Sequence, residues 1–388
     1  MKLKRVLVNL LLLLGTFLCC ILVLEVGLWL FASAPLVKDC VDSDLGWRHI
    51  PNARFVHSRK EFKVLVSYNS FGMRDTEHDL IKPPGVFRIA VLGDSFMEGS
   101  QVPLDSVYSK VLERLLREKG VCCETLNFGV NNYGTDQEVI LLGKNVFRFD
   151  PDLVIVSLVR NDIMSNFTRG ICSLSEKGEL EIIPPGVSLS SRVRAWLYQN
   201  SRLFVFLNIR LTKLMTAGAR YRPHAPEIFG VGKETKEPDL FTIEQDLAKS
   251  LMRMYAKESD PKLIPVRRLT ETLLKEIHRR CQERGVKFLL LIIPGRTEVR
   301  PERWLNNLNE YGFKPEDYAY EALDRWLLDF AAKEGIAAFS YLESFRKLRT
   351  ERGINLYWEI DAHWNPSGHR EAARLTVEAL DSLGFLPL

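Results

Sequence analysis

The sequence carries little net charge for its length. Its 388 residues include 53 lysines and arginines against 49 aspartates and glutamates, which leaves a formal net charge of +4. Spread over such a chain, this excess is too small to indicate a nucleic-acid partner. The apolar fraction of 46% and the charged fraction of 26% are those of ordinary globular proteins. They disfavour wholesale disorder, collagen-like repeats and a polytopic membrane protein.

A cysteine framework is also missing. The chain has 7 cysteines, an odd number, and no two of them have the spacing Cys-x-x-Cys. Such a set fits neither a disulfide scaffold nor a zinc ribbon. No cluster of metal-ligating residues is visible in the sequence, so we expect neither a metal nor a cofactor.

One long apolar run is present, close to the N-terminus. From Val6 to Leu24 no residue is charged, and a helix of this length spans the hydrocarbon core of a bilayer, roughly 30 Å. Basic residues precede the run and aspartates follow it, so the positive-inside rule keeps the N-terminus cytoplasmic. Glu25 is expected to mark the outer end of the span, because a carboxylate is costly at the bilayer centre.

We therefore predict that residues 1–35 form a cytoplasmic tip and a single-pass inner-membrane anchor. The remainder is then exported, to the periplasm or the cell exterior. The alternative is a cleaved signal peptide, because Ala32-Ser33-Ala34 resembles a cleavage site. The apolar run is, however, longer than the usual secretory core of about 7–15 residues.

Beyond residue 85, short β-rich runs alternate with helical patterns. Expected strands are 87–92, 125–128, 152–158, 287–293 and 336–341, and expected helices are 107–119, 266–282, 319–332 and 366–383. This alternation predicts an α/β fold, with a parallel sheet of about five strands covered by helices on both faces.

The predicted domain organisation has three parts. Residues 1–35 form the anchor, residues 36–85 a linker and N-terminal extension, and residues 86–388 the main domain, with an insertion at about 165–262. Within the insertion, Arg192–Met215 combines apolar and basic residues. It is interpreted either as an amphipathic helix on the membrane surface or over the site as a lid, or as a helix packed on the domain.

Residues that follow the predicted strands are the candidates for chemistry, because ligands of parallel sheets bind at the carboxyl ends of the strands. A serine hydroxyl after the first strand needs a base to become a nucleophile. In an extended backbone, Asp361 and His363 would point to the same side. The aspartate could then hold the imidazole while its other nitrogen faces the serine. The candidate segments are Gly93-Asp94-Ser95-Phe96, Asn127-Phe128-Gly129, Arg160-Asn161-Asp162 and Asp361-Ala362-His363.

Together these segments resemble the SGNH (GDSL-type) hydrolase family, over roughly residues 86–165 and 286–388, and the chain resembles a membrane-anchored bacterial member. The resemblance implies a flavodoxin-like three-layer α/β/α sandwich. It makes Ser95 the nucleophile, His363 the base and Asp361 the acid that orients it. The oxyanion hole is then formed by the backbone N–H groups of Ser95 and Gly129 and the amide of Asn161.

The resemblance leads to expectations for two more residues, and the sequence differs from the family pattern at two places. Asp94 is expected to fix the turn that carries Ser95, and His369 to pack inside the last helix, with the role of base as its alternative. The family's third block usually has a glycine where Val159 stands. Its second block usually continues to a further glycine, where Asn131-Asn132 stands.

The resulting hypothesis is a membrane-anchored, extracytoplasmic serine esterase that removes acyl groups, chiefly O-acetyl, from glycans or lipids. The alternative is an O-acyltransferase that acetylates an exported polysaccharide, with a membrane-bound partner supplying the acyl group. A third hypothesis is a non-catalytic glycan-binding module. The acceptor, water or sugar, is not fixed by the sequence.

Overall fold

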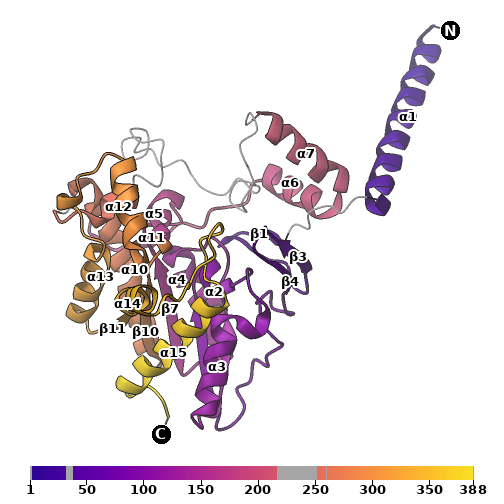
Figure 1. Cartoon of the computed structure of the whole chain (residues 1–388). Helices are drawn as coiled ribbons and strands as arrows, with labels where there is room; N and C mark the ends of the chain where they lie inside the picture. Colours follow the sequence, from indigo (N-terminus) through magenta and orange to yellow (C-terminus); the bar gives the residue numbers. More distant parts are fainter. Residues whose placement is uncertain (1, 32–37, 216–250, 259, 388) are drawn as a thin grey trace. The chain divides into compact units, whose positions relative to one another are not determined.

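The computed structural model describes residues 2–31, 38–215, 251–258 and 260–387 (Figure 1). The Ala32-Ser33-Ala34 segment and the middle of the predicted insertion lie outside the described residues. The chain divides into two compact units. One comprises Met1–Arg48 with Gly186–Val231, and the other comprises His49–Pro185 with Gly232–Leu388.

The larger unit is built on a five-stranded sheet in which all strands are parallel. The strands are β5 (Phe87–Leu92), β6 (Cys123–Asn127), β7 (Leu153–Val159), β10 (Lys287–Ile293) and β11 (Ala337–Ser340). Their order across the sheet is β11-β10-β7-β5-β6. This order is that of a flavodoxin-like fold, so the predicted fold class is confirmed.

Helices cover both faces of this sheet (Figure 1). One apolar cluster joins α3, α14 and α15 to inward residues of the central strands, such as Ile89 and Ile155. On the other face, α10 packs on α4 and β10, and Trp326 of α13 donates to Glu271 of α10 (2.7 Å). The helices of this unit are α2 (Ser95–Glu98), α3 (Tyr108–Glu118), α4 (Thr135–Lys144), α5 (Arg160–Arg169), α10 (Ile264–Gln282), α11 (Arg296–Val299), α12 (Pro301–Glu310), α13 (Ala322–Lys333), α14 (Leu342–Arg352) and α15 (Pro366–Ser382).

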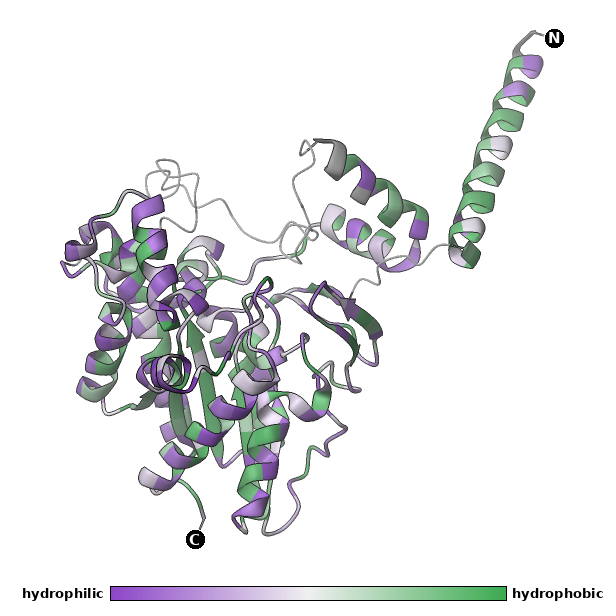
Figure 2. Cartoon of the chain, viewed as in Figure 1, coloured by the Kyte–Doolittle hydropathy of each residue, from purple (hydrophilic) through white to green (hydrophobic). Residues whose placement is uncertain are grey.

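The central strand β7 shows why these runs form a parallel sheet. Every residue of β7 is buried, and its sequence Leu-Val-Ile-Val-Ser-Leu-Val is apolar at six of seven positions. A strand covered by helices on both faces has no solvated side, so it reads as a continuous apolar run. Figure 2 shows the corresponding green strands within the larger unit.

Small antiparallel pairs complete the described structure. The strands β3 (Arg54–Ser58) and β4 (Lys63–Ser67) form a hairpin with its own apolar cluster, which includes Phe62, Val66 and Tyr68. The strands β1 (Asp39–Asp42) and β2 (Gly46–His49) pair with each other, as do β8 (Cys172–Leu174) and β9 (Leu180–Ile182). The N-terminal extension is thus folded into strands over much of its length.

The smaller unit contains the N-terminal helix α1 (Lys2–Phe31), of which Lys4–Phe31 is long and apolar enough to cross a membrane. Such a helix fits a membrane anchor or a signal sequence. The carboxylate of Glu25 accepts hydrogen bonds from the backbone N–H groups of Arg202 and Leu203 (2.5 and 3.0 Å) and from the Ser201 hydroxyl (2.8 Å). Glu25 therefore binds the N-terminus of a second helix, where a negative charge is favourable.

The single helix predicted over 192–215 is wrong. The structure has two helices there, α6 (Leu189–Asn200) and α7 (Arg202–Met215). The helical conformation is interrupted at Ser201, whose backbone is extended (φ −127°, ψ 110°). The Ser201 hydroxyl accepts from the Phe204 N–H (3.0 Å) and so caps α7, which is the usual reason that serine favours a helix start over a helix interior.

Candidate active site

The turn after β5 presents Ser95 at the start of a short helix. Asp94 is the N-cap of α2, and its Oδ1 accepts from the Phe96 N–H (2.9 Å). A Cβ at Gly93 would collide with the Ser157 hydroxyl and the Met97 side chain, so this close approach requires glycine. The strand therefore ends in a tight turn that places the Ser95 side chain at the carboxyl edge of the sheet.

The imidazole of His363 connects Ser95 to Asp361. Ser95 Oγ lies 2.8 Å from His363 Nε2, and His363 Nδ1 lies 2.5 Å from Asp361 Oδ1. Because a carboxylate is beside Nδ1, that nitrogen carries the proton and Nε2 is free to accept from the hydroxyl. The His363 side chain is 28% exposed, against 10% for Asp361, so the imidazole is open to solvent while the carboxylate is largely covered.

The loop that carries Asp361 and His363 is a turn, not an extended segment. Tyr357 and Trp364 form an antiparallel bridge, and the Trp358 N–H donates to the His363 carbonyl (2.9 Å). Ala362, at the tip, has φ +73°, a left-handed conformation that is unfavourable for a residue with a Cβ. The backbone here is thus not extended, and the turn itself brings the two side chains together.

The pKa of Asp361 is lowered, so the carboxylate stays ionised. Burial acts to raise this pKa, but the hydrogen bond with His363 and the nearby charges of His363, Arg59 and His57 outweigh burial. Arg59 Nε lies 3.7 Å from the Asp361 Oδ2. An ionised Asp361 can stabilise the imidazolium that forms when His363 takes a proton.

The predicted oxyanion donors gather on the Ser95 turn, but two of them already have partners. The Gly129 N–H donates to the Asn127 Oδ1 (3.0 Å). The Asn161 amide donates to Asp94 Oδ2 (3.3 Å) and to Asp162 Oδ1 (3.1 Å). No described residue accepts from the Ser95 N–H. A substrate oxygen entering here would find the Ser95 donor open and would compete with protein oxygens for the other two.

The two departures from the family pattern are accommodated locally. Asn132 has φ +63°, and asparagine is among the few residues besides glycine that adopt this conformation readily. Val159 is buried at the end of β7, and its N–H donates to Asp162 Oδ2 (2.8 Å). Helix α5 begins at the next residue, so Asn161 lies in the first turn of a helix that the sequence analysis did not predict.

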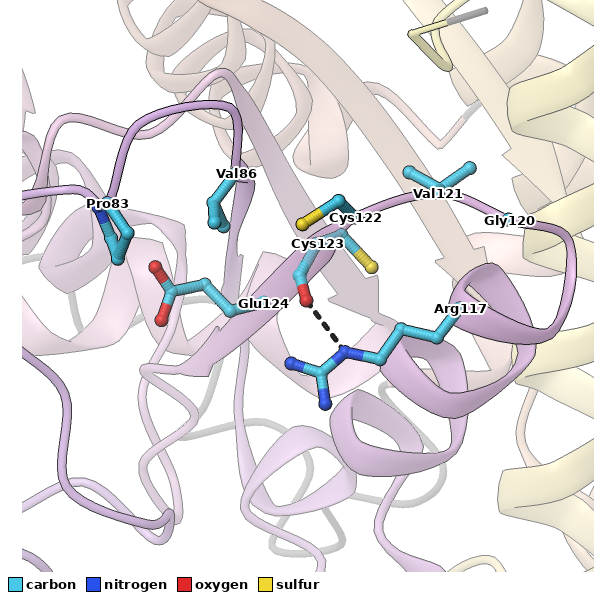
Figure 3. A pocket seen from close by; sticks show the side chains of 8 residues that line it. All are labelled: Pro83, Val86, Arg117, Gly120, Val121, Cys122, Cys123 and Glu124. Atoms are coloured by element: carbon cyan, nitrogen blue, oxygen red, sulfur yellow. Dashed lines mark hydrogen bonds between the residues drawn. The ribbon is translucent and has the colours of Figure 1, made fainter.

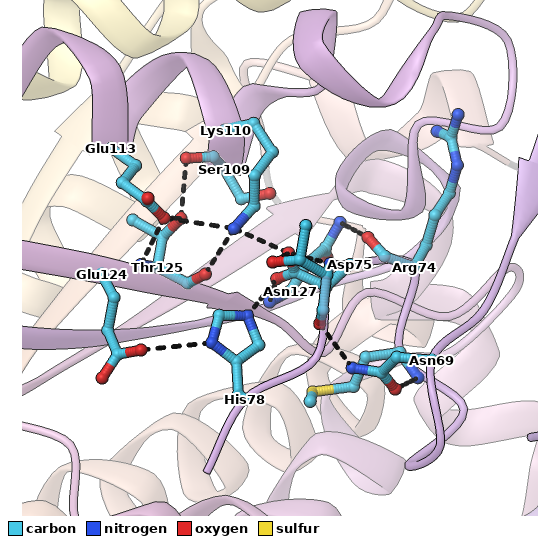
Figure 4. A network of polar contacts seen from close by, with 12 residues as sticks. Asn69, Arg74, Asp75, His78, Ser109, Lys110, Glu113, Glu124, Thr125 and Asn127 are labelled. Carbon is cyan, nitrogen blue, oxygen red and sulfur yellow. Dashed lines mark hydrogen bonds and ion pairs between the residues drawn. The ribbon is translucent and has the colours of Figure 1, made fainter. Parts of the chain in front are cut away.

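A polar network outside the predicted site residues fixes the end of β6 (Figure 4). The Asp75 carboxylate accepts from the Asn127 N–H (2.9 Å) and pairs with Lys110 (2.6 Å) and His78 (3.2 Å). Burial acts to raise the pKa of Asp75, but the His78 and Lys110 contacts lower it. Because Asn127 also binds the Gly129 N–H, the network reaches one of the predicted oxyanion donors.

Arg74, the residue before Asp75, binds the C-terminal end of α2. Its guanidinium donates to the Glu98 carbonyl (2.9 Å) and to the carbonyls of Gly99 and Val102, and the side chain is buried. Orphan carbonyls at a helix C-terminus attract such a cation. Sequence reasoning missed Arg74 and Asp75, and their adjacency in a polar turn between two strands was the only signal.

Among the described residues, four buried carboxyl groups around the Ser95 turn and helix α4 have raised pKa values. Burial raises the pKa of each of these groups. At Glu138 and Asp162, the negative charges of neighbouring carboxylates raise the pKa further. Both carboxyl oxygens of Glu138 lack a hydrogen-bond partner among the described residues. The four are Asp94, Asp136, Glu138 and Asp162. No group of His, Cys, Asp and Glu in the described part of the chain has the geometry of a metal site.

The second histidine near the site, His369, is occupied elsewhere. Its Nδ1 accepts from the Tyr108 N–H at the start of α3 (3.2 Å), and it is almost fully buried. Burial, followed by the charges of Arg74 and His363, lowers the pKa of His369 to about 3. His369 is therefore neutral and caps α3, and His363 is the imidazole that reaches Ser95.

A hollow of about 480 Å³ lies at the opposite end of the strands (Figure 3). It adjoins the start of β6, where Arg117 Nε donates to the Cys123 carbonyl (2.9 Å), whereas Ser95 follows the carboxyl end of the parallel strand β5. The hollow is therefore separate from the candidate active site. It is lined by Pro83, Val86, Arg117, Gly120, Val121, Cys122, Cys123 and Glu124.

The C-terminal third of the chain matches a known family. Residues 257–386 match the model described as "SGNH hydrolase-like domain, acetyltransferase AlgX". The matched segment contains Asp361 and His363, whereas Ser95, Gly129 and Asn161 lie outside it. This match supports hydrolase or acyltransferase activity. No curated protein sequence matches the chain.

Solved structures similar to this chain include several esterases. TesA covers 76% of this chain and 99% of its own length, at 13% identity and a TM-score of 0.38. The acetyl xylan esterase AlAXEase covers 76% and 100%, at 11% identity and a TM-score of 0.37. A lipase/acylhydrolase from Enterococcus faecalis covers 78% and 98%, at 13% identity and a TM-score of 0.38.

Proposed function

Because this chain carries an SGNH hydrolase-like domain, we propose that it is a serine esterase that cleaves acyl esters, chiefly O-acetyl, through Ser95, His363 and Asp361. The observation that carries the proposal is the chain of hydrogen bonds from the Ser95 hydroxyl through the His363 imidazole to the Asp361 carboxylate (2.8 and 2.5 Å). A hydroxyl that is hydrogen-bonded to an oriented imidazole has the arrangement of an activated nucleophile.

The reaction proceeds in two steps. Ser95 Oγ attacks the ester carbonyl while its proton moves to His363 Nε2, and Asp361 stabilises the imidazolium. The carbonyl oxygen, now an oxyanion, accepts from the Ser95 N–H and draws the Gly129 N–H and the Asn161 amide from their present partners. His363 then protonates the leaving alkoxide, which leaves an acyl group on Ser95. Water, activated by His363, then attacks this acyl group, releases it as the acid and restores the serine.

The second candidate function is acyl transfer to a glycan, and the family description favours it. The matched family is described as an acetyltransferase, and the same acyl group on Ser95 can pass to a sugar hydroxyl instead of water. In this version, the chain acetylates an exported polysaccharide, and a membrane-bound partner supplies the acyl group. The two versions share every residue and differ only in the acceptor.

We also propose that α1 is an uncleaved anchor and that the enzyme works outside the cytoplasm, in the periplasm or at the cell exterior. The length and apolar composition of Lys4–Phe31 support a spanning helix, and the basic residues that precede it favour a cytoplasmic N-terminus. A membrane-anchored enzyme facing outward has its acyl-ester substrates among exported glycans or lipids.

The test uses the full chain in detergent or nanodiscs, with a fluorophosphonate probe and p-nitrophenyl acetate. We expect labelling and turnover in the wild type, and the loss of both in Ser95→Ala. Ser106→Ala is the control, because the Ser106 hydroxyl bonds the exposed Asp105 (3.0 Å). A wild type that is neither labelled nor active contradicts the proposal and favours a glycan-binding module. Adding an acetyl donor and a polysaccharide then separates esterase from transferase, by whether acetate appears free or glycan-bound.

A further inference from the structure

The β3–β4 hairpin lies outside the central sheet, yet its tip contacts the loop that carries Asp361 and His363. The carboxylate of Glu61, at the tip, accepts three consecutive backbone N–H groups. Oε1 accepts from Glu359 (2.7 Å), and Oε2 accepts from Ile360 and Asp361 (2.9 and 3.0 Å). Hydrogen bonds to a charged acceptor are stronger than neutral ones, so Glu61 restrains the backbone that leads into the candidate site, where Arg296 also donates to the carbonyls of Trp358 and Glu359.

Two more contacts join the same tip to the same loop. Arg59 Nε faces the Asp361 Oδ2 at 3.7 Å, which is the oxygen that His363 does not use. The ring of Phe62 lies against Trp358, with centroids 5.5 Å apart, and Trp358 joins the apolar cluster of the hairpin. The loop is therefore held by backbone hydrogen bonds, a charge and an aromatic contact, all from residues 59–62.

The other side of the hairpin contacts the segment that carries Ser95. His57 Nδ1 lies 3.2 Å from both the carbonyl and the hydroxyl of Ser100, two residues beyond α2. Just after β4, the Tyr68 hydroxyl donates to the carboxylate of Glu98 (2.7 Å), the last residue of α2. The hairpin and the residue after it thus contact both the segment that carries Ser95 and the loop that carries His363, which are far apart in the sequence.

We propose that the β3–β4 hairpin is a positioning element for the catalytic pair, and that Glu61 and Arg59 are its positioning residues. This inference rests on the proposed function. The loop needs such a restraint because Ala362, between Asp361 and His363, has an unfavourable left-handed backbone (φ +73°). Glu61 binds the three residues directly before Ala362, and Arg59 orients the carboxylate that holds the imidazole.

Glu61→Gln tests the backbone contacts. An amide has one acceptor oxygen, and its NH₂ group opposes the loop N–H groups, so the restraint is lost while the volume is kept. We expect kcat for p-nitrophenyl acetate to fall about 10- to 100-fold with KM within about twofold, because small misplacements of reacting groups are costly. Glu61→Asp keeps the charge with a shorter reach, and it should recover part of the loss.

Glu77→Gln is the matched control. Glu77 also binds a backbone N–H and a hydroxyl, both of Ser70 (2.8 and 2.6 Å), and lies in the same N-terminal extension, but it does not touch the loop of Asp361. Its kcat should stay within about twofold of the wild type. If Glu61→Gln is as active as Glu77→Gln, the hairpin does not position the pair and the proposal is overturned.

Arg59→Gln is tested by the pH dependence of the rate, which would not change if Arg59 had only a structural role. The groups facing Asp361 are His363, Arg59 and His57, with Glu61 on its backbone. Without the guanidinium charge, the coupled His363–Asp361 pair takes up its proton at a higher pH. The acidic limb of the rate profile should therefore move up by about half a pH unit, whereas Lys60→Gln, at the exposed neighbouring position, should leave it in place. An unmoved limb in Arg59→Gln overturns the role of Arg59, even if Glu61→Gln fails to fold.

The proposed function and this inference fail differently. If Ser95→Ala keeps labelling and turnover, the serine mechanism is wrong whatever the hairpin variants do. If Ser95→Ala is inactive while Glu61→Gln and Arg59→Gln behave as their controls do, the mechanism stands and only the positioning role falls.

Discussion

Ser95 Oγ and His363 Nε2 lie 2.8 Å apart, although 268 positions separate the two residues along the chain. One follows the first strand of the parallel sheet and the other precedes the last helix, and both lie at the carboxyl edge, where such sheets bind ligands. The contact is therefore a consequence of topology. Four predictions test the candidate site and two other parts of the structure.

Asp361→Asn should lower kcat by about 10⁴ while the fold is kept. An amide can present an N–H to His363 Nδ1, which forces the proton onto Nε2 and leaves Ser95 without an acceptor. Steady-state kinetics with p-nitrophenyl acetate check this. Asp329→Asn, at an exposed position on α13, is the control, and equal activity of the two variants would contradict the assigned role of Asp361.

Asn161→Ala should lower kcat by about 10²–10³ with little change in KM, as the loss of one oxyanion donor does elsewhere. Asn309→Ala, at the exposed end of α12, controls for the loss of an amide as such. Asn161 also bonds Asp94, so thermal unfolding of the variant should be measured alongside. A folded Asn161→Ala enzyme with wild-type kcat would remove Asn161 from the oxyanion hole.

The network of Asp75 and His78 predicts a pH dependence of stability. Burial acts to lower the pKa of His78, but hydrogen bonds and charges from Asp75 and Glu124 raise it above the ordinary value. The stabilisation from His78 is thus complete below about pH 6.5, the unfolded value, and is lost as the pH rises through the raised value. The free-energy difference between wild type and His78→Gln should shrink as the pH rises from about 6.5 through the raised pKa.

Urea unfolding across this range measures that difference, and a constant difference would contradict the account of the network. His278→Gln is the control. Burial lowers the pKa of His278, so its contribution does not decline as the pH rises.

Glu25→Gln should loosen the start of α7 in the full-length chain. Glu25 accepts the N–H groups of Arg202 and Leu203, and loss of a capping carboxylate costs about 1 kcal/mol. Hydrogen exchange of those two amides should therefore speed up about fivefold. Thr16→Val, which removes a hydroxyl bonded within α1, should leave them unchanged. Equal exchange in Glu25→Gln and the wild type would show that the contact does not hold α7.

Much of the fold was predictable because its signals are local. Strands such as Lys287–Ile293 are continuous apolar runs that end at a glycine or proline, and the helix at Pro366 begins with an asparagine cap that accepts from Gly368 (3.0 Å). Helix α14 and the break at Ser201 were missed. The first has a short polar sequence, and the second combines the local cap of Ser201 with a contact to Glu25, a residue 176 positions away.

The site was predictable only in part, for the same reason. Ser95, Gly129 and Asn161 follow strands, and that placement made them candidates. Apart from the contact of Asp75 with His78, Arg74, Asp75 and Glu61 act through residues 24 to 300 positions away. No periodicity or motif spacing in their own segment indicates those distant partners. The engagement of the Gly129 N–H by Asn127 was likewise invisible, because a side chain's choice among several donors is decided by three-dimensional packing.

The most direct test of the central claim is to quench the reaction with an acetyl ester at low pH and to analyse the trapped enzyme by mass spectrometry. The account predicts a single acetyl group on the peptide that contains Ser95, absent from Ser95→Ala and from His363→Ala. An acetyl group on another residue, or none in an enzyme that turns the ester over, would contradict the assignment of Ser95 as the nucleophile.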